Sequence, residues 1–288
     1  MAKRVVICGG TGFIGSALQR QLIEAEYEVV IVTRHPNGDQ VRWDQLASVI
    51  EGSKAVINLA GRSFACKFSE ENKRQILESR LESSKNVAAA INQCTVKPEK
   101  WINSSATGFY GDRGDEILTE SSPPGTSFQS EVCILWEDAC LKSSVQIAKT
   151  VIRTGVVLSG HGGVLKALIP LTKAFAGGAA GNGKQWLPWI HIDDIVGIYC
   201  WAIEHDTPEI ICGSAPEATP NRDFMAWLRK TYNRPWAPPI PSFIIELEGK
   251  LIGPDASLVL GSCRISPREP QGYPFKFPTL AEISQQDL

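Results

Sequence analysis

Cys8-Gly9-Gly10-Thr11-Gly12-Phe13-Ile14-Gly15 is the stretch of sequence that decides the fold. It follows a continuous apolar run, from Arg4 to Cys8, that is typical of a strand buried on both faces. A helical pattern follows it over residues 13–25. A strand, a glycine-rich turn and a helix in this order are what a dinucleotide-binding loop requires, so the segment predicts nucleotide binding rather than an ordinary turn.

Each glycine of the loop has its own expected role. Gly9 permits the tight turn out of the strand, Gly12 lets the backbone approach a pyrophosphate, and Gly15 allows close packing of the helix. The free N–H groups at the start of the helix, together with its dipole, favour the phosphates. We expect cofactor contacts throughout the loop, at Gly9, Thr11, Gly12, Phe13, Ile14 and Gly15.

The end of the second predicted strand, over 28–33, indicates which cofactor is bound. An acidic residue there would accept hydrogen bonds from a ribose 2′-OH, whereas an arginine accommodates a 2′-phosphate. Arg34 follows Thr33 directly, and the nearest acid, Asp39, lies beyond Pro36. Because a guanidinium binds phosphate through two charge-assisted hydrogen bonds, Thr33 and Arg34 favour NADP over NAD. The alternative is that Arg34 is a solvated surface side chain.

Two further strands are expected to bring residues to the cofactor. The strand over 54–59 ends in Leu59-Ala60-Gly61, whose small side chains let adenosine or ribose lie against the backbone. Ser104 stands at the end of the strand over 100–105. The long helical pattern over 70–93 includes Arg80, which faces either the cofactor or solvent.

The bulk properties exclude several classes of protein. The 288 residues carry a formal net charge of −2, which gives no electrostatic reason to expect nucleic acid or an anionic membrane as partner. No apolar run reaches the length of a membrane span, and the chain starts with a strand rather than a signal peptide. The eight cysteines are scattered without a Cys-x-x-Cys pair, which fits a reduced, cytoplasmic setting with no metal site.

Segments in the second half of the chain have less specific patterns. An apolar run over 147–158 predicts one more strand, and the glycine-rich segment over 176–184 is either a mobile lid or a plain connector. Asp193 or Asp194 is placed to cap the helix predicted over 195–204. The tail over 275–280 is expected to be a strand or the capped start of a helix.

Motifs along the whole chain resemble the extended short-chain dehydrogenase/reductase superfamily. The loop at 9–15, Asn-Leu-Ala-Gly at 58–61 and Ser-Ser-Ala-Thr at 104–107 carry this resemblance. Other segments resemble the atypical epimerase-family branch of sugar-nucleotide-epimerase-like proteins: Ser-Ala-Thr-Gly-Phe-Tyr-Gly (105–111), Arg-Thr-Gly-Val-Val-Leu (153–158), Pro-Trp-Ile-His-Ile-Asp-Asp (188–194) and the tail over 258–278.

The resemblance implies an α/β fold, a Rossmann-type doubly wound parallel sheet with a smaller C-terminal substrate lobe. The NADP-binding domain would span 1–160, with a contribution from about 189–206. The substrate-side lobe would span 161–288 and include the small C-terminal domain of that branch. The resemblance also places Gly155 near the nicotinamide.

The superfamily's acid/base device is missing from the sequence. That device is a serine or threonine with a tyrosine and a lysine four residues apart, in which the lysine lowers the pKa of the phenol. Here Cys133 and Glu137 stand four apart instead. Ser105 best matches the serine position, with Thr107 as the alternative. Glu137 and Tyr110 are the candidate acid/base groups, and Cys133 is a poor general acid or a packing residue.

Three functions remain open at this point. The first is an NADP(H)-dependent oxidoreductase acting on a small carbonyl, alcohol or nucleotide-sugar substrate, where the cofactor carries the hydride chemistry. The second is a nucleotide-sugar epimerase with a tightly held cofactor. The third is a non-catalytic NADP-binding sensor or partner-binding protein. We expect a monomer or homodimer.

Overall fold

The structure, a computed structural model, describes residues 3–251, 253–268, 270 and 272–288. Its main sheet is built from β1 (Arg4–Cys8), β2 (Glu28–Val32), β3 (Ala55–Asn58), β4 (Lys100–Ala106), β6 (Ala148–Thr154) and β11 (Ile210–Gly213). The strands run parallel in the order β11-β6-β4-β3-β1-β2. The α/β fold with a doubly wound parallel sheet is therefore confirmed.

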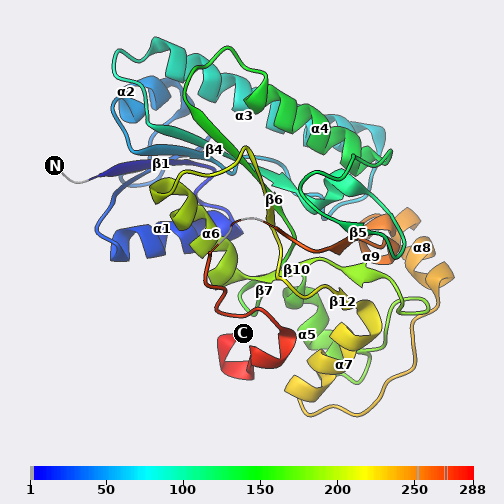
Figure 1. The fold of residues 1–288 in the computed structure, drawn as a ribbon. Coiled ribbons are helices and arrows are strands. Elements are labelled where there is room, and N and C mark those ends of the chain that lie inside the picture. The colour runs from blue at the N-terminus through cyan, green and yellow to red at the C-terminus, as the bar shows by residue number, and fades with distance from the viewer. Residues whose placement is uncertain (1–2, 252, 269, 271) are drawn as a thin grey trace.

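Helices cover both faces of this sheet (Figure 1). One face is covered by α1 (Phe13–Glu24) and α6 (Ile192–Glu204), and the other by α2 (Leu46–Ile50), α3 (Glu70–Gln93) and α4 (Phe128–Leu141). Each face has its own apolar core, which explains why the strands read as uninterrupted β-branched runs. The carboxyl ends of the strands are left open for ligands.

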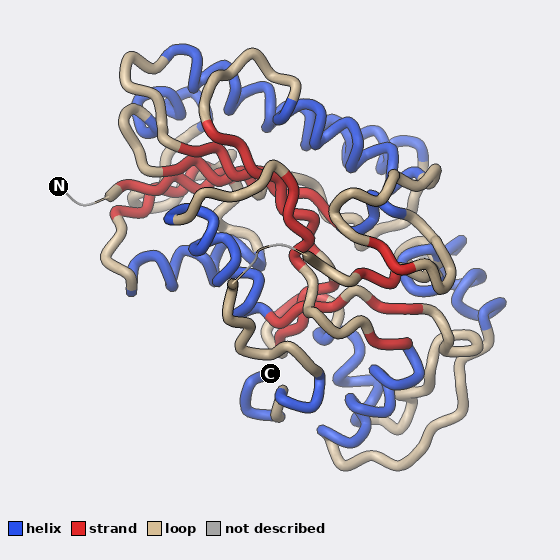
Figure 2. Tube along the Cα trace, viewed as in Figure 1, coloured by secondary structure: helices blue, strands red, loops and turns tan. Residues whose placement is uncertain are grey.

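A smaller lobe packs beside the carboxyl ends of the strands (Figure 2). Its short strands are β7 (Val156–Ser159), β8 (Gly162–Gly163), β9 (Trp186–Leu187), β10 (Trp189–His191) and β12 (Thr219–Pro220). Its helices are α5 (Leu165–Lys173), α7 (Asn221–Thr231), α8 (Ser242–Leu251) and α9 (Ser257–Leu260). A pair of two-residue strands, β5 (Ile117–Leu118) and β13 (Arg264–Ile265), ties its last part to the larger domain.

The single strand expected over 147–158 is wrong, because the chain bends at Gly155 and changes sheets. The Gly155 N–H donates to the carbonyl of Gly213 at 2.8 Å, whereas the next N–H, that of Val156, donates to the carbonyl of Pro188 at 2.6 Å. A Cβ on Gly155 would overlap that Pro188 carbonyl. The bend therefore needs glycine, and it joins the main sheet to the lobe.

Two caps differ from the sequence prediction. α6 is capped by neither aspartate: His191 is the N-cap, and its Nδ1 accepts from the N–H of Asp193 at 3.2 Å. The tail forms no strand over 275–280. Instead, Thr279 and Glu282 form a capping box around a 3-10 turn, Leu280–Glu282. Of the two predicted structures, the capped start of a helix is therefore confirmed.

Asp194 fastens the tail to α6. Its carboxylate, fully buried, accepts from the N–H groups of Lys276 at 2.7 Å and Phe277 at 2.9 Å. Burial raises the pKa of this carboxyl above its ordinary value, and the two N–H groups oppose that shift. The carboxylate thus satisfies two backbone donors that would otherwise be buried without acceptors.

Replacing Asp194 by alanine is expected to lower the free energy of unfolding by about 1–3 kcal/mol, since it leaves buried donors unsatisfied. Asp193→Ala is the matched control: its carboxylate is half-exposed, pairs with the exposed Lys276 ammonium and lies 3.8 Å from Nδ1 of His191, so its loss costs under about 1 kcal/mol. Urea unfolding monitored by circular dichroism measures both. Equal losses in the two variants would contradict the anchoring role of Asp194.

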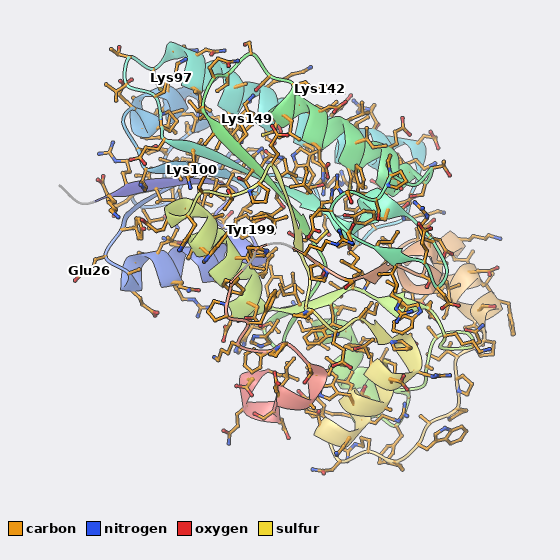
Figure 3. The ribbon with its side chains drawn as sticks, in the orientation of Figure 1. Glu26, Lys97, Lys100, Lys142, Lys149 and Tyr199 are labelled. Atoms are coloured by element: carbon orange, nitrogen blue, oxygen red, sulfur yellow. The ribbon has the colours of Figure 1, made fainter. Side chains whose placement is uncertain are left out.

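Lysines at the amino ends of two neighbouring strands cap helices (Figure 3). The Lys149 ammonium donates to the carbonyls of Leu141 at 3.2 Å and Ser143 at 3.1 Å, at the end of α4. The Lys100 ammonium donates to the carbonyls of Ala202, at 3.1 Å, and His205, at the end of α6. Both charges complement the negative ends of helix dipoles. Within the described ranges, no helix has the length and apolar character needed to cross a membrane.

Candidate functional site

A cleft of about 830 Å³ lies at the carboxyl ends of β1, β2 and β3, beside α3. Eight of the residues expected to bind the cofactor line it: Gly9, Thr11, Gly12, Thr33, Arg34, Leu59, Ala60 and Gly61. These residues come from three separate strand ends. The parallel sheet brings them together, which is the arrangement that a dinucleotide site requires.

The glycine loop has the geometry of a phosphate cradle. Gly9 has a φ of +82°, and a Cβ there would lie 2.9 Å from the backbone of Ala60. A Cβ on Gly15 would lie 2.6 Å from the Cα of Gly10, so this glycine lets α1 pack tightly against the loop. A Cβ on Gly12 would meet only the Gly9 carbonyl oxygen, at 3.4 Å, and the rest of its surroundings is open.

The start of α1 also faces this cleft without a protein cap. Its N-cap is Gly12, and no side chain accepts from the first N–H groups of the helix. Such groups bind anions, because their N–H donors and the helix dipole act together. The residues present therefore fit the pyrophosphate of a dinucleotide.

Two residues that sequence reasoning missed also line this cleft. Trp43 offers an aromatic face at the carboxyl end of β2, where adenine can stack. Arg62 adds a second guanidinium, held by its Nη2 at 2.7 Å from Oδ1 of Asn72. Arg62 directly follows the predicted Leu59-Ala60-Gly61, so the same strand-end argument could have found it. Trp43 has no such signal, because it lies in a connection.

The remaining predicted cofactor contacts lie outside this cleft. The Phe13 ring lies against Gly162 and Gly163 of the lobe, and Ile14 packs against the apolar core. Gly15 is buried beneath Gly10. Ser104 is buried, and its hydroxyl donates to the Ser105 carbonyl at 3.4 Å. Gly155 borders a second cleft, described below.

Arg80 is buried behind the first cleft, with 6% of its surface exposed. Its Nη1 donates to the carbonyls of Arg62 at 2.8 Å and Ile76 at 2.9 Å, and its guanidinium lies between the rings of Phe64 and Trp136. Burial lowers its pKa to about 10. In the described part of the chain, no carboxylate pairs with it. Arg80 therefore faces aromatic rings and carbonyl oxygens. The sequence predicted that it would face either the cofactor or solvent.

The predicted acid/base residues form a buried network around Arg153. Glu137 receives two hydrogen bonds from that guanidinium, from Nε to Oε1 at 2.9 Å and from Nη2 to Oε2 at 2.8 Å. The Ser105 hydroxyl donates to the same Oε1 at 2.6 Å. Arg153 and Glu137 side chains are each 5% exposed. A bidentate pair of this kind holds both charges in place rather than presenting them to a ligand.

Tyr110 belongs to the same network. It is fully buried, and its hydroxyl lies 2.9 Å from Nη1 of Arg153 and 3.0 Å from Sγ of Cys212. Burial raises the pKa of this phenol, so it stays protonated at neutral pH. The Arg153 guanidinium also stacks on the neighbouring ring of Phe109.

A second cleft, with a volume of about 500 Å³, lies between the larger domain and the lobe. Thr107, Cys133 and Gly155 border it, whereas Ser105, Glu137 and Tyr110 do not. Burial raises the pKa of the Cys133 thiol to about 11, so this group stays a neutral thiol near pH 7. Among the described residues, no three His, Cys, Asp or Glu side chains are grouped to hold a metal ion.

Comparison with known proteins agrees with this geometry. The model of the "NAD dependent epimerase/dehydratase family" matches residues 5–212. A relative from Arabidopsis thaliana, "Epimerase family protein SDR39U1 homolog, chloroplastic", is 31% identical, covering 95% of this chain and 83% of the relative.

Two crystal structures resemble the whole chain. That of human epimerase family protein SDR39U1 (isoform2) with NADPH has a TM-score of 0.92 at 30% identity and covers 98% of both chains. That of a nucleoside-diphosphate sugar epimerase from Corynebacterium glutamicum has a TM-score of 0.77 at 33% identity, covering 97% of this chain and 57% of the other. The chain therefore belongs to the NAD dependent epimerase/dehydratase family, within the extended short-chain dehydrogenase/reductase branch of epimerase-family proteins that its motifs resemble.

Proposed function

We propose that this protein is an NADP(H)-dependent oxidoreductase acting on a small carbonyl or alcohol. The observation that carries the proposal is the pairing of the two clefts. The first offers a glycine cradle and an arginine at the end of β2, and the second adjoins it where Ser63 of the first lining is followed by Phe64 of the second. The human relative solved with NADPH supports the same cofactor.

The residues of the chain would divide the work as follows. The loop from Gly9 to Gly12 and the start of α1 bind the pyrophosphate, and Arg34 binds the 2′-phosphate. When bound, NADPH supplies the hydride for the reaction. Thr107 borders the second cleft and can donate its hydroxyl to a substrate oxygen. Cys133, a neutral thiol beside it, shapes the cleft, and Glu137 holds Arg153 rather than exchanging protons with substrate.

The cofactor assignment predicts a loss that is confined to NADPH. Arg34→Ala is expected to weaken NADPH binding by about 10-fold to 100-fold, since a hydrogen bond to a charged group contributes about 1.5–3 kcal/mol. NADH lacks the 2′-phosphate, so its binding should not change. Titration calorimetry measures both cofactors on both proteins.

Arg20→Ala is the matched control for this experiment. Arg20 is also exposed but lies on α1, outside the residues that line the cleft. It tests whether the loss at Arg34 is local or reflects only the removal of one positive charge. Equal weakening in the two variants would contradict the 2′-phosphate contact, and absence of binding by either cofactor to the wild type would refute the proposed function.

A non-catalytic NADP-binding sensor is the second candidate. It is favoured by the network around Arg153, because Glu137, which stands where the superfamily's lysine would, is neutralised by that guanidinium. An NADPH-binding protein that transfers no hydride to any carbonyl in a broad panel would support the sensor over the oxidoreductase.

We propose that the protein resides in the cytoplasm. The eight cysteines are free, which supports a reducing compartment such as the cytoplasm. We infer a monomer or homodimer, which size-exclusion chromatography with light scattering can measure.

A further inference from the structure

The charge of the second cleft bears on the class of substrate. Among its described lining residues there is no lysine, arginine or histidine. The charged residues that do line it are two carboxylates, Asp112 and Glu246, both exposed. An anionic ligand placed in this cleft would therefore meet like charges, which is unfavourable even near solvent.

Three arginines that contact or directly neighbour lining residues of this cleft already have other partners. Arg264 stacks on the Trp186 ring, with its guanidinium carbon 4.2 Å from the ring centroid. Arg153 is held by Glu137. Arg80 packs on Phe64, 4.4 Å from the centroid of that ring, and is not among the described residues that line the cleft. A diphosphate usually binds where arginines offer paired donors, and none is offered here by the described lining.

The walls of the second cleft are apolar. Leu258 and Val259 of α9 line it while remaining 38% and 43% exposed, and Trp186 and Leu187 of β9 contribute further apolar surface. Covering exposed apolar side chains of a concave site with an apolar ligand lowers the free energy of the complex. An apolar ligand in this cleft would cover Leu258 and Val259.

The side-chain amides that line this cleft already form hydrogen bonds with other residues of the protein. Gln129 Nε2 donates to Ser257 Oγ at 2.7 Å, and Asn221 Oδ1 accepts from the N–H of Ala180 at 2.8 Å. Gln185 Nε2 donates to the carbonyls of Ala180 and Val259. Few polar groups, chiefly the Thr107 hydroxyl, are left to recognise a substrate oxygen.

We propose that the second cleft takes an uncharged, largely apolar carbonyl or alcohol and excludes nucleoside diphosphate sugars. The inference rests on the proposed function, because it takes NADP(H) to occupy the first cleft. The lack of cationic side chains in the described lining of the second cleft argues against the nucleotide-sugar epimerase alternative.

The test uses the full chain saturated with NADPH. Saturation-transfer NMR and oxidation of NADPH are followed with three neutral ketones, benzylacetone, cyclohexanone and 2-nonanone, and with UDP-glucuronic acid. We expect binding of at least one ketone, and no displacement of it by UDP-glucuronic acid.

A pair of leucine variants locates the binding site. Leu258→Asp adds a third negative charge to the apolar wall and is expected to weaken ketone binding about tenfold, through loss of the apolar contact. Leu251→Asp makes the same change at an exposed leucine of α8 outside the described lining of the cleft, and should leave binding unchanged. Both side chains are exposed, so the fold should tolerate either change.

The outcomes separate the two proposals. NADPH binding without binding of any ketone would overturn the inference alone, as would displacement of a ketone by UDP-glucuronic acid. Equal effects of Leu258→Asp and Leu251→Asp would overturn the placement of the substrate in this cleft. If the wild type binds no NADPH, the proposed function is refuted, and the inference that rests on it is refuted with it.

Discussion

Replacing Glu137 by glutamine is expected to lower the free energy of unfolding by about 3–5 kcal/mol. The substitution keeps the shape of the side chain but removes the charge that compensates a guanidinium buried at 5% exposure. One amide N–H₂ would then face Nη2 of Arg153, which is also a donor. Urea unfolding of the variant and the wild type measures the difference.

Two controls show whether the buried pair causes this loss. Asp138→Asn changes the next residue, whose carboxylate pairs with Lys142 on the exposed side of α4, and should cost under about 1 kcal/mol. The double variant Glu137→Leu/Arg153→Met removes both charges and should recover much of the lost stability. If Glu137 served as a proton donor or acceptor instead, Glu137→Gln would abolish NADPH oxidation while leaving the unfolding curve in place.

Gly9→Ala is expected to remove NADPH binding and to destabilise the protein more than a left-handed backbone alone would. A side chain at a φ of +82° costs about 1–2 kcal/mol. The new Cβ would also lie 2.9 Å from the backbone of Ala60, and relieving that overlap adds about 1–3 kcal/mol. Thermal unfolding and NADPH titration provide the two readouts.

Gly38→Ala separates these two causes. Gly38 has a similar φ of +62°, but a Cβ there meets nothing within 4 Å. Its replacement should therefore lower the free energy of unfolding only by the cost of placing a side chain at a positive φ, about 1–2 kcal/mol. Most of the NADPH affinity should remain. If both variants lost the same stability, the close approach of the loop to β3 would have no energetic role.

The larger domain could be predicted from the sequence because its signals are local. The apolar run before Gly9 became β1, and the helical pattern over 70–93 became α3 with the same bounds. The bend at Gly155 could not be predicted in this way. The apolar pattern continues through it, and the bend is fixed by hydrogen bonds to Gly213 and Pro188, which are distant in sequence.

The cofactor loop could be predicted for the same reason, whereas the network around Arg153 could not. Gly9 and Gly12 act through their own backbone, so their spacing carries the information. Glu137 and Arg153 belong to different elements, and only the fold brings them together. One signal was present: an arginine inside a buried apolar strand needs a partner. That signal requires a carboxylate without saying which one.

The position of β11 has a consequence for how the protein is made. β11 pairs with β6 and completes the main sheet, and α6 covers one of its faces, yet both follow the first strands of the lobe in sequence. A nascent chain that has emerged only as far as residue 160 would display an unpaired edge of β6 and the uncovered apolar face of α1. Such surfaces are recognised by chaperones and promote aggregation. The chain must therefore emerge from the ribosome to beyond residue 213 before the cofactor domain can complete its sheet and bury its apolar core.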